Sequence, residues 1–363
     1  MYNKRVNNKF CILPWISLSI GTDGQIHPCC QVVPFENPDN IRDYQGDEYQ
    51  KTPNLNRLRK QFLAGECPSE CSQCFVQEDQ GGVSMRMIKN NAWKEVVEEQ
   101  KFDHDPLSLV EFDIRFSNVC QLSCLTCEPL FSTSWYQYEK ENPISKEKKV
   151  LRSFENVESI DQFVKDHGSH LRLLTVTGGE PLLEPLALEF FHRIDNQNIE
   201  LNLNTGLMLP ESVLQKNLDE LKKFKNIKVA ISLDGIAQHA EKIRRGLDWN
   251  LFLSNLNLFK KEIGEEHLYF QITCSSLNAG SICEVLNWIH TEHRSMLIRT
   301  LLNFVHSPRK YNSQLASPSQ KDEWMRSNHS LLKSKLFQNL NDDEYGHILK
   351  LLAQVSTFLQ SAP

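Results

Sequence analysis

The sequence predicts an α/β protein: a partial barrel of six βα units, preceded by a small cysteine-rich module and followed by C-terminal helices. Three observations lead to this prediction. From residue 110 onward, short β-like runs alternate with helical stretches, which is typical of a parallel sheet with crossover helices. Several of these runs alternate strictly between apolar and polar residues. The first hundred residues lack this rhythm and hold six of the eleven cysteines.

The elements can be placed in order along the chain. Helical segments at 211–224 and 250–263 show one apolar face each, and Asp248 is a suitable cap for the second. We predict four segments: a cysteine-rich module at 1–89, a helical linker at 90–109, the barrel at 110–307 and a helical extension at 308–363. The six predicted strands are residues 110–116, 171–177, 199–204, 228–234, 268–273 and 297–304.

The alternation within the strands predicts what the barrel encloses. In the first strand Val110, Phe112 and Ile114 share one face, while Asp113 and Arg115 share the other. If the apolar faces lie against the helices, the polar faces line a ligand chamber, so we expect a partial (β/α)6 barrel of the TIM type rather than a packed core. The alternative is an antiparallel sheet with one solvated face.

Composition narrows the function classes. The 363 residues carry a formal net charge of -6 with Lys and Arg scattered, so a nucleic-acid partner is not expected. No apolar run approaches the length of a membrane span, and the N-terminus has no secretory h-region, so we expect a cytoplasmic protein without membrane partners. Eleven cysteines in tight groups indicate metal binding rather than disulfides.

The stretch from Asn118 to Pro129 holds Cys120, Cys124 and Cys127 in the spacing C-x3-C-x2-C. It follows the first predicted strand, at the end where the ligand-binding loops of parallel α/β barrels collect. Three thiolates around a four-iron cluster would leave one iron open for a small molecule, and catalytic zinc sites also use three protein ligands. The number of cysteines alone therefore leaves the metal undecided.

The spacing together with the βα barrel resembles the radical S-adenosylmethionine superfamily over residues 110–304. The resemblance implies that Cys120, Cys124 and Cys127 hold a 4Fe-4S cluster whose open iron binds S-adenosylmethionine. One electron then cleaves the sulfonium to a 5′-deoxyadenosyl radical, which abstracts a hydrogen atom from the substrate. It also implies a flavodoxin-like or ferredoxin-like electron donor.

Further residues match the family in register, and their roles are implied by the resemblance. Gly178, Gly179 and Glu180 precede Pro181, similar to the GGEP motif that contacts the methionine amino group. The segment ISLDG supplies Ser232 and Asp234 as candidates for binding the ribose. Arg244 or Arg245 matches an arginine that holds the carboxylate, and the other is expected to be a solvated surface charge. Asn204 is a candidate adenosine or substrate contact.

One position departs from the family pattern. Many members carry an aromatic residue just before the third cysteine, where it packs on the adenine, and this chain has Thr126 there. We therefore expect Phe116 or Phe131 to supply the adenine contact.

The N-terminal cysteines resemble the twitch domain, the short form of the SPASM domain, which carries an auxiliary 4Fe-4S cluster. The implied ligands are Cys11, Cys29, Cys71 and Cys74. Spacing does not rank Cys29 against Cys30, and a structural zinc remains an alternative. In the family this domain usually follows the barrel, whereas here it precedes it.

The resemblance implies a radical S-adenosylmethionine oxidoreductase that acts on a peptide or protein substrate, with the auxiliary cluster assisting electron transfer. Two alternatives stay open: oxidation of a small aminocyclitol or sugar by the same chemistry, and a zinc-stapled interaction protein without enzymatic activity.

Overall fold

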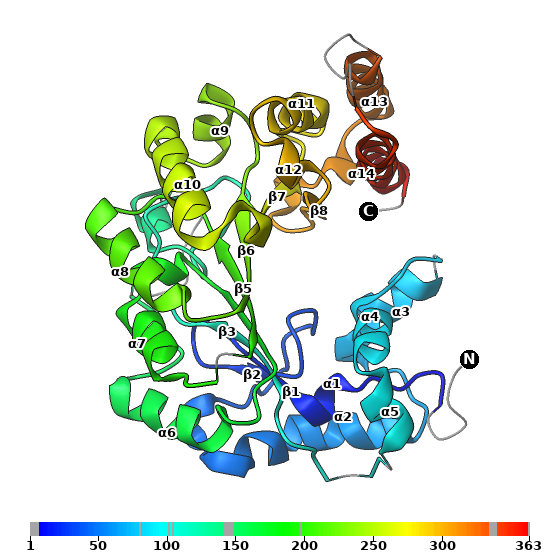
Figure 1. The fold of residues 1–363 in the computed structure, drawn as a ribbon. Coiled ribbons are helices and arrows are strands. Elements are labelled where there is room, and N and C mark those ends of the chain that lie inside the picture. The colour runs from blue at the N-terminus through cyan, green and yellow to red at the C-terminus, as the bar shows by residue number, and fades with distance from the viewer. Residues whose placement is uncertain are drawn as a thin grey trace. The chain divides into compact units, whose positions relative to one another are not determined.

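A computed structural model describes residues 7–79, 81–100, 102–103, 105–138, 140, 149–196, 198–333 and 340–361. An eight-stranded sheet with the strand order β2-β1-β3-β4-β5-β6-β7-β8 organises these residues, and helices alternate with the strands along the chain (Figure 1). By compactness the chain divides into two units. Unit 1 comprises residues 1–117, 151–201 and 224–226, and unit 2 comprises residues 118–150, 202–223 and 227–363. The predicted domain boundaries at 89, 109 and 307 stay a prediction.

The strands confirm the predicted α/β class. The six predicted strands all form, as β3 (Glu111–Arg115), β4 (Leu173–Thr177), β5 (Glu200–Thr205), β6 (Asn226–Ser232), β7 (Leu268–Cys274) and β8 (Leu301–Phe304). The pairs β3–β4, β6–β7 and β7–β8 are parallel. The last strand is shorter than predicted, because residues 294–297 form the short helix α12 (Arg294–Leu297) instead.

The sequence shows short β-like pieces around residues 22–28, but it does not predict that the N-terminal region adds two strands of unit 1 to the sheet. Residues Ser17–Ile20 form β1, which pairs in parallel with β3, and Ile26–His27 form β2, which pairs with β1 in the antiparallel sense. Polar and apolar residues alternate in β1, Ser-Leu-Ser-Ile, but the run is only four residues long, and all four are buried in the structure. The cysteine-rich N-terminal region therefore extends the sheet instead of forming a separate layer.

In unit 1, the apolar faces of β3 and β4 lie against two helices, α6 (Val157–His167) and α7 (Pro185–Arg193). Phe112 of β3 packs on Phe163 of α6, with ring centroids 4.9 Å apart, and Phe116 packs on Phe190 of α7 at 5.2 Å. Asp113 and Arg115 alternate with these residues and are only partly buried. The two faces of β3 thus differ as the sequence predicts, because successive side chains of a strand point to opposite sides.

The N-terminal region is joined to β3 by polar as well as apolar contacts within unit 1. Its helices are α1 (Leu13–Ile16), α2 (Pro53–Leu63), α3 (Ser72–Asp79), α4 (Met85–Ala92) and α5 (Lys94–Glu99). Glu111 at the start of β3 accepts hydrogen bonds from the Lys89 ammonium and, at 3.0 Å, from the indole N–H of Trp93. Arg86 forms an ion pair with Glu78 and donates to the Phe10 carbonyl at 2.8 Å, so α4 is tied to α3 and to the chain before α1.

Unit 2 holds the remaining helices. They are α8 (Glu211–Leu221), α9 (Gln238–Ile243), α10 (Trp249–Ile263), α11 (Ile282–Glu292), α12, α13 (Pro318–Leu332) and α14 (Asp342–Gln360). Asp248 caps α10, accepting from the backbone N–H groups of Asn250 and Leu251, as predicted. Cys274 in β7 and Cys283 in α11 are fully buried, which agrees with their interpretation as core residues. Helix α14 packs on β8 through Phe358, whose ring lies 4.3 Å from that of Phe304.

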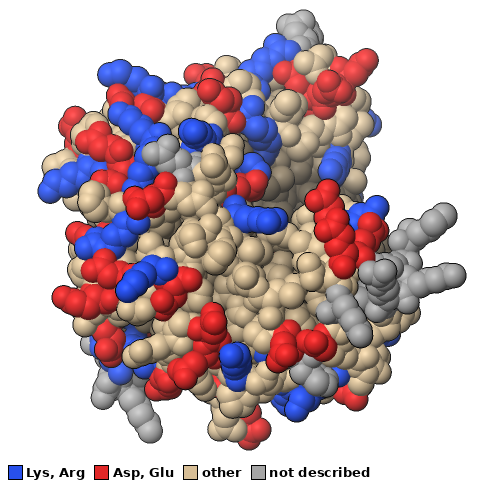
Figure 2. Space-filling view, turned by 60° about the horizontal axis from the view of Figure 1, so that its bottom comes forward, with Lys and Arg blue, Asp and Glu red and all other residues tan. Residues whose placement is uncertain are grey.

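Charged residues of both signs are intermixed on the face of the molecule drawn in Figure 2, in agreement with the scattered charge of the sequence. None of the described helices is long and apolar enough to cross a bilayer.

Glu344, in the first turn of α14, should stabilise unit 2 in a pH-dependent way. Its carboxylate accepts from Arg294 at 2.6 and 2.7 Å and completes a capping box with Asn341. The hydrogen bonds from Arg294 lower the pKa of Glu344 to about 2. The stabilisation is therefore complete above the ordinary pKa near 4.5 and is lost as the pH falls toward 2.

We expect Glu344→Gln to lower stability at pH 7 by about 1 kcal/mol, a modest value because Arg294 is half exposed. Thermal unfolding of the variant and the native protein at pH 7, 5 and 3 measures the difference, which should shrink on acidification. Asp343→Asn, an exposed change in the same helical turn, is the control. A difference that does not change with pH would contradict the assignment.

Candidate functional site

The loop that carries Cys120, Cys124 and Cys127 is held in unit 2 by backbone hydrogen bonds. The N–H of Ser123 donates to the Arg245 carbonyl at 2.9 Å, and that of Leu125 donates to the Ile243 carbonyl at 2.8 Å. Gly246, at φ +97°, lies so close that a Cβ there would stand 3.1 Å from the Gln121 carbonyl. The backbone at Ile243, Arg245 and Gly246 therefore fixes the position of the cysteine loop.

Side chains from the following segment support the same loop from within. The indole N–H of Trp135 donates to the Cys124 carbonyl at 3.1 Å, and the Ser134 hydroxyl donates to the Cys120 carbonyl at 2.7 Å. Trp135 is 1% exposed. A carbonyl bonded to a buried indole has little freedom to move, so the positions of the thiols depend on the packing of Trp135.

The three thiols lie close enough together to influence each other's ionisation. The pKa of Cys127 is raised well above its usual range, mainly by burial and further by Cys124 and Cys120, while Arg244 opposes the rise. Burial and the two neighbouring thiols keep the free Cys127 thiol protonated. A metal or cluster that withdraws electron density from the sulfurs would remove the repulsion between them, which is the behaviour expected of a ligand set.

Arg244 is the cation of this site. Its side chain is 11% exposed and donates to the Asp234 carboxylate at 2.9 Å. Burial by itself would lower the pKa of this guanidinium, but Cys124, Asp234 and Cys120 together raise it. Its Nε–H is buried and has no partner among the described residues. The guanidinium therefore has an unused donor beside the thiols.

Asp234 is a positioning residue in this geometry. Its side chain is 1% exposed, and one oxygen accepts from Arg244 while the other accepts from the backbone N–H of Thr273 at 2.8 Å. Both carboxylate oxygens thus have protein partners. The predicted contact of Asp234 with a ribose stays a prediction, and Ser232, which is half-buried at the end of β6, has the more accessible hydroxyl.

Arg245 is not the solvated surface charge expected for one of the two arginines. Its guanidinium lies over the ring of Tyr138, 4.1 Å from the centroid, and 5.6 Å from that of Trp135. This cation–π stacking holds the Arg245 guanidinium against the two rings, so Arg245 is not a freely mobile surface charge. The expectation was wrong because the aromatic partners come from a segment more than one hundred residues earlier in the chain.

The residues fit a cluster with three thiolate ligands. The donor set is three cysteines of one loop, and an unsatisfied cationic N–H lies beside it, which suits an anionic group and its carboxylate-bearing ligand. No three His, Cys, Asp or Glu side chains in the described part of the chain converge on one metal-ion position. The thiolates of a four-iron cluster each bind a different iron, so they need not converge.

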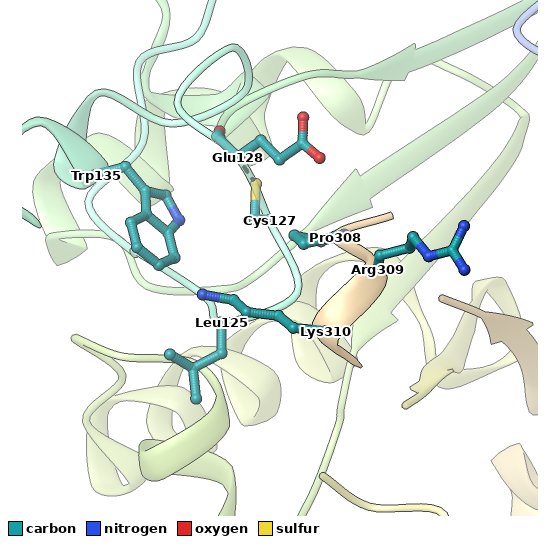
Figure 3. A pocket seen from close by; sticks show the side chains of 7 residues that line it. All are labelled: Leu125, Cys127, Glu128, Trp135, Pro308, Arg309 and Lys310. Atoms are coloured by element: carbon teal, nitrogen blue, oxygen red, sulfur yellow. Dashed lines mark hydrogen bonds between the residues drawn. The ribbon is translucent and has the colours of Figure 1, made fainter. Parts of the chain in front are cut away.

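A cavity of about 300 Å³ opens beside the loop in unit 2. Its lining includes Cys127, Trp135 and Lys310, and Figure 3 shows the Lys310 side chain extending toward Trp135 while the Arg309 guanidinium extends away. The Ser307 hydroxyl donates to the Glu128 carboxylate at 2.6 Å and ties residues 307–310 to the loop. Motif reasoning missed this segment, because nothing in SPRK indicates that it lies beside Cys127.

The glycines of the GGEP motif lie in unit 1, directly after β4. Gly178 has φ +120°, and a Cβ there would stand 3.0 Å from the Ser117 carbonyl, so only glycine fits without strain. The N–H of Gly179 donates to the same carbonyl at 3.0 Å. Glu180 is buried and caps the short 3-10 helix Pro181–Leu183 by accepting from Leu182 at 3.4 Å. The motif is thus a tight strand-to-helix turn, and its contact with an amino group stays a prediction.

Two further predicted contacts can be placed within their own units. Asn204 is half-buried near the end of β5, on the polar face of that strand. Phe116 is 1% exposed and packs between Phe154 and Phe190, so the expectation that it stacks on an adenine is wrong. The strand alternation that buries Phe112 also turns Phe116 toward the helices. Phe131 is half-buried and stays a candidate.

The N-terminal thiols form a second group, in unit 1. Cys11, Cys29, Cys71 and Cys74 lie within electrostatic reach of one another in all six pairings. Burial is the largest cause that raises the pKa of Cys11, Cys29 and Cys71. Cys11, Cys29 and Cys71 contact the same hydrophobic cluster of the N-terminal region. The structure thus brings together the four cysteines that the sequence selected as ligands.

The geometry also separates Cys29 from Cys30. Cys29 is within electrostatic reach of Cys30 and also of Cys11, Cys71 and Cys74, whereas the charged neighbours of the Cys30 thiol include Asp113 and Arg115 of β3. Cys30 and Cys67 are exposed. This arrangement favours Cys29 as the ligand, a choice that sequence spacing left open.

Comparisons with known proteins give the following matches. Residues 114–288, just under half of the chain, match the Radical SAM superfamily. The solved structure of native anSMEcpe with bound AdoMet is 19% identical, with 62% of this chain and 60% of that chain covered and a TM-score of 0.42. This chain therefore spans less than two thirds of that protein.

Streptococcus suis SuiB bound to S-adenosylmethionine is 11% identical, with 90% and 69% covered and a TM-score of 0.44. SuiB bound to its precursor peptide SuiA is 12% identical, with 76% and 78% covered and a TM-score of 0.34. No curated protein matches this sequence significantly.

The separation of Cys29 from Cys30 can be tested by metal content. After anaerobic reconstitution with iron and sulfide, Cys29→Ser should lose about half of the bound iron, because one ligand of the N-terminal group is missing. Cys30→Ser is the matched control and should keep the iron content of the native protein. Iron and sulfide analysis of the purified variants measures this. Loss of iron in Cys30→Ser with retention in Cys29→Ser would reverse the assignment.

Proposed function

We propose that this protein, whose residues 114–288 match the Radical SAM superfamily, is an enzyme that reductively cleaves S-adenosylmethionine and uses the resulting radical to modify a peptide or protein side chain. The observation that carries the proposal is the grouping of Cys120, Cys124 and Cys127 on one loop beside the buried Arg244. A second cluster held by the N-terminal thiols would assist electron transfer.

A 4Fe-4S cluster held by the three thiolates would leave one iron open for the amino-acid end of S-adenosylmethionine and would supply the electron that cleaves the sulfonium. The chain's own residues prepare this site. Arg244 places a permanent positive charge beside the thiolates, and its unpaired Nε–H can donate to a carboxylate. Asp234 holds Arg244 in place and is itself held by the backbone of β7.

The remaining predicted contacts have geometries that suit their proposed roles. Gly178 and Gly179 have no side chain, so a ligand can approach the backbone at the end of β4. Ser232 and Asn204 lie at the ends of β6 and β5, where loops and strand termini of α/β barrels bind ligands. Trp135 is buried under the cysteine loop and excludes water from its inner side.

The second cluster rests on Cys11, Cys29, Cys71 and Cys74. Four thiolates can fill all the protein-ligand positions of a four-iron cluster, so electron transfer and structural support are the roles we propose for it. Their neighbours in the hydrophobic cluster, including Phe10, Phe62 and Phe75, would shield it from water. A zinc ion on the same four thiolates is the competing occupant.

Peptide or protein side chains are the proposed substrate class, since the N-terminal cysteine pattern resembles that of peptide-maturing family members. A small aminocyclitol or sugar is the alternative.

Anaerobic purification tests the whole proposal: we expect a brown protein with absorbance at about 400 nm and several irons per chain. A colourless protein with stoichiometric zinc would favour a zinc-stapled interaction protein.

The role of the loop that carries Cys120, Cys124 and Cys127 can be tested by substitution. Cys124→Ala should abolish reductive cleavage of S-adenosylmethionine, because one of three thiolate ligands is removed, while the N-terminal irons stay bound. Chromatographic measurement of 5′-deoxyadenosine under dithionite, with iron analysis, checks both parts. Cys67→Ala, an exposed cysteine outside both groups, is the control. Undiminished 5′-deoxyadenosine from Cys124→Ala would refute the assignment of the loop.

The role of Arg244 can also be tested by substitution. Arg244→Lys should weaken S-adenosylmethionine binding at least about tenfold, or about 1.4 kcal/mol, because an ammonium cannot bond Asp234 and a carboxylate with one planar fork. Equilibrium binding of S-adenosylmethionine to the reconstituted protein measures this.

Arg245→Lys should have the smaller effect, since Arg245 stacks on Tyr138 and its backbone carbonyl is what bonds the loop. The reverse order of the two effects would identify Arg245 as the ligand-binding residue.

A further inference from the structure

A row of polar side chains crosses four neighbouring strands of unit 1. His27 of β2 is paired with Ser19 of β1, Ser19 with Asp113 of β3, and Asp113 with Thr175 of β4. Directly paired residues of adjacent strands project from the same face of a sheet. This face is the one opposite to Phe112 and Phe116, which contact α6 and α7. We call these side chains, with Arg115 and Thr177, the polar platform.

The centre of the polar platform is an incomplete ion pair. Asp113 and Arg115 have side chains only 14% and 21% exposed, yet their closest contact is 3.5 Å, from Arg115 Nη2 to Asp113 Oδ2. The Ser19 hydroxyl donates to the same Oδ2 at 3.1 Å, and Arg115 Nη1 donates to Ser19 at 3.3 Å. The other oxygen, Asp113 Oδ1, is buried and has no partner among the described residues.

Two more polar atoms of the platform share this condition. Thr177 is the register partner of Arg115, and its hydroxyl is buried. The Nδ1 atom of His27 is buried as well, and neither atom has a hydrogen-bond partner among the described residues. Arg115, whose side chain is 21% exposed, donates from two of its five N–H groups in the two contacts above. Unsatisfied donors and acceptors therefore lie together on one face.

Such an arrangement is unfavourable unless something completes it. A buried acceptor without a partner loses the hydrogen bonds it would make to water, and a partly buried ion pair stabilises a protein only when its geometry is good. The platform is built from two regions that are distant in the sequence, strands β1–β2 and strands β3–β4, and each contributes unsatisfied atoms. Unsatisfied buried groups concentrated in this way are characteristic of a site that a ligand completes.

The charges of the platform limit the ligand's chemistry. A carboxylate would be attracted by Arg115 but would repel Asp113, and an ammonium would meet the reverse conflict. A neutral amide has no such conflict, since its N–H can donate to Asp113 Oδ1 while its carbonyl accepts from Arg115. We propose that the polar platform binds an amide group of the substrate, either the peptide backbone or a side-chain carboxamide. This inference rests on the proposed peptide substrate class.

The Cys30 thiol offers a way to detect occupancy without any enzymatic turnover. It is exposed and its charged neighbours are Asp113 and Arg115, whereas Cys67 is exposed elsewhere in unit 1. A ligand on the platform should therefore shield Cys30 from alkylation and leave Cys67 unaffected. Because neither S-adenosylmethionine nor a reductant is needed, the readout is independent of the proposed reaction.

The experiment measures the alkylation rates of Cys30 and Cys67 by N-ethylmaleimide in the anaerobic, iron-loaded full chain, by peptide mass spectrometry. The probe is N-acetylglycinamide at about 50 mM, a concentration suited to the weak affinity of a small fragment. Methyl O-acetylglycolate, which has both carbonyls but no N–H, is the matched control probe. We expect at least a threefold slower reaction at Cys30 with the amide, about 0.7 kcal/mol, and no change at Cys67.

Variants of platform residues test whether the protection of Cys30 depends on the polar platform. Asp113→Asn and Arg115→Gln should each remove the protection of Cys30, while Asp161→Asn, which alters an Asp–Arg pair on the outer helices, should keep it. An unchanged rate at Cys67 and an unchanged iron content in each variant show that the chain is still folded. Equal protection by the ester, protection at both thiols, no protection at all, or protection that survives Asp113→Asn would each overturn the inference.

One further variant separates this inference from the proposed function. Cys124→Ala should still show amide protection at Cys30, because that substitution leaves the platform intact. If the native protein shows protection but never cleaves S-adenosylmethionine, the proposed reaction fails and the platform stands. If it cleaves S-adenosylmethionine but shows no protection, the platform fails and the reaction stands.

Discussion

The two-residue period of the β-strands is the constraint on which the rest of this structure depends. In β3 it turns Phe112, Ile114 and Phe116 toward the helices, and the same geometry leaves Asp113 and Arg115 on the other face. The burial of β4 and β5 alternates in the same way. A slip of one residue would expose the aromatic core and bury the ion pair, so the apolar packing determines where the polar groups stand.

Electrostatics in unit 2 depend on one buried cation. Arg244 lies next to two of the loop's thiols, and the loop's backbone is bonded to the residues on either side of it, Ile243 and Arg245. The same short segment thus fixes the loop's position and its charge environment. Asp234 keeps the guanidinium oriented, and a buried charge that is paired in this way costs far less than an isolated one.

The sequence indicates a separate N-terminal module, whereas in the structure the N-terminal region is joined to β3. Its strand β1 is hydrogen-bonded to β3, and Glu111 receives hydrogen bonds from Lys89 and Trp93. The four cysteines Cys11, Cys29, Cys71 and Cys74 are therefore held by the same unit that forms the polar platform. Cys30, next to Cys29 in the chain, has Asp113 and Arg115 of the platform as its charged neighbours, because the chain turns at Cys29 and Cys30 after β2.

The sequence by itself determined the α/β class, the six strands from β3 to β8 and the two groups of cysteines, because these depend on local periodicity and spacing. Tertiary structure alone decided that β1 joins the sheet, that Cys29 rather than Cys30 lies with the other thiols, and that Arg245 stacks on Tyr138. Each of these depends on contacts between residues far apart in the chain, and no local pattern encodes which distant surface a strand edge, a thiol or a guanidinium will meet.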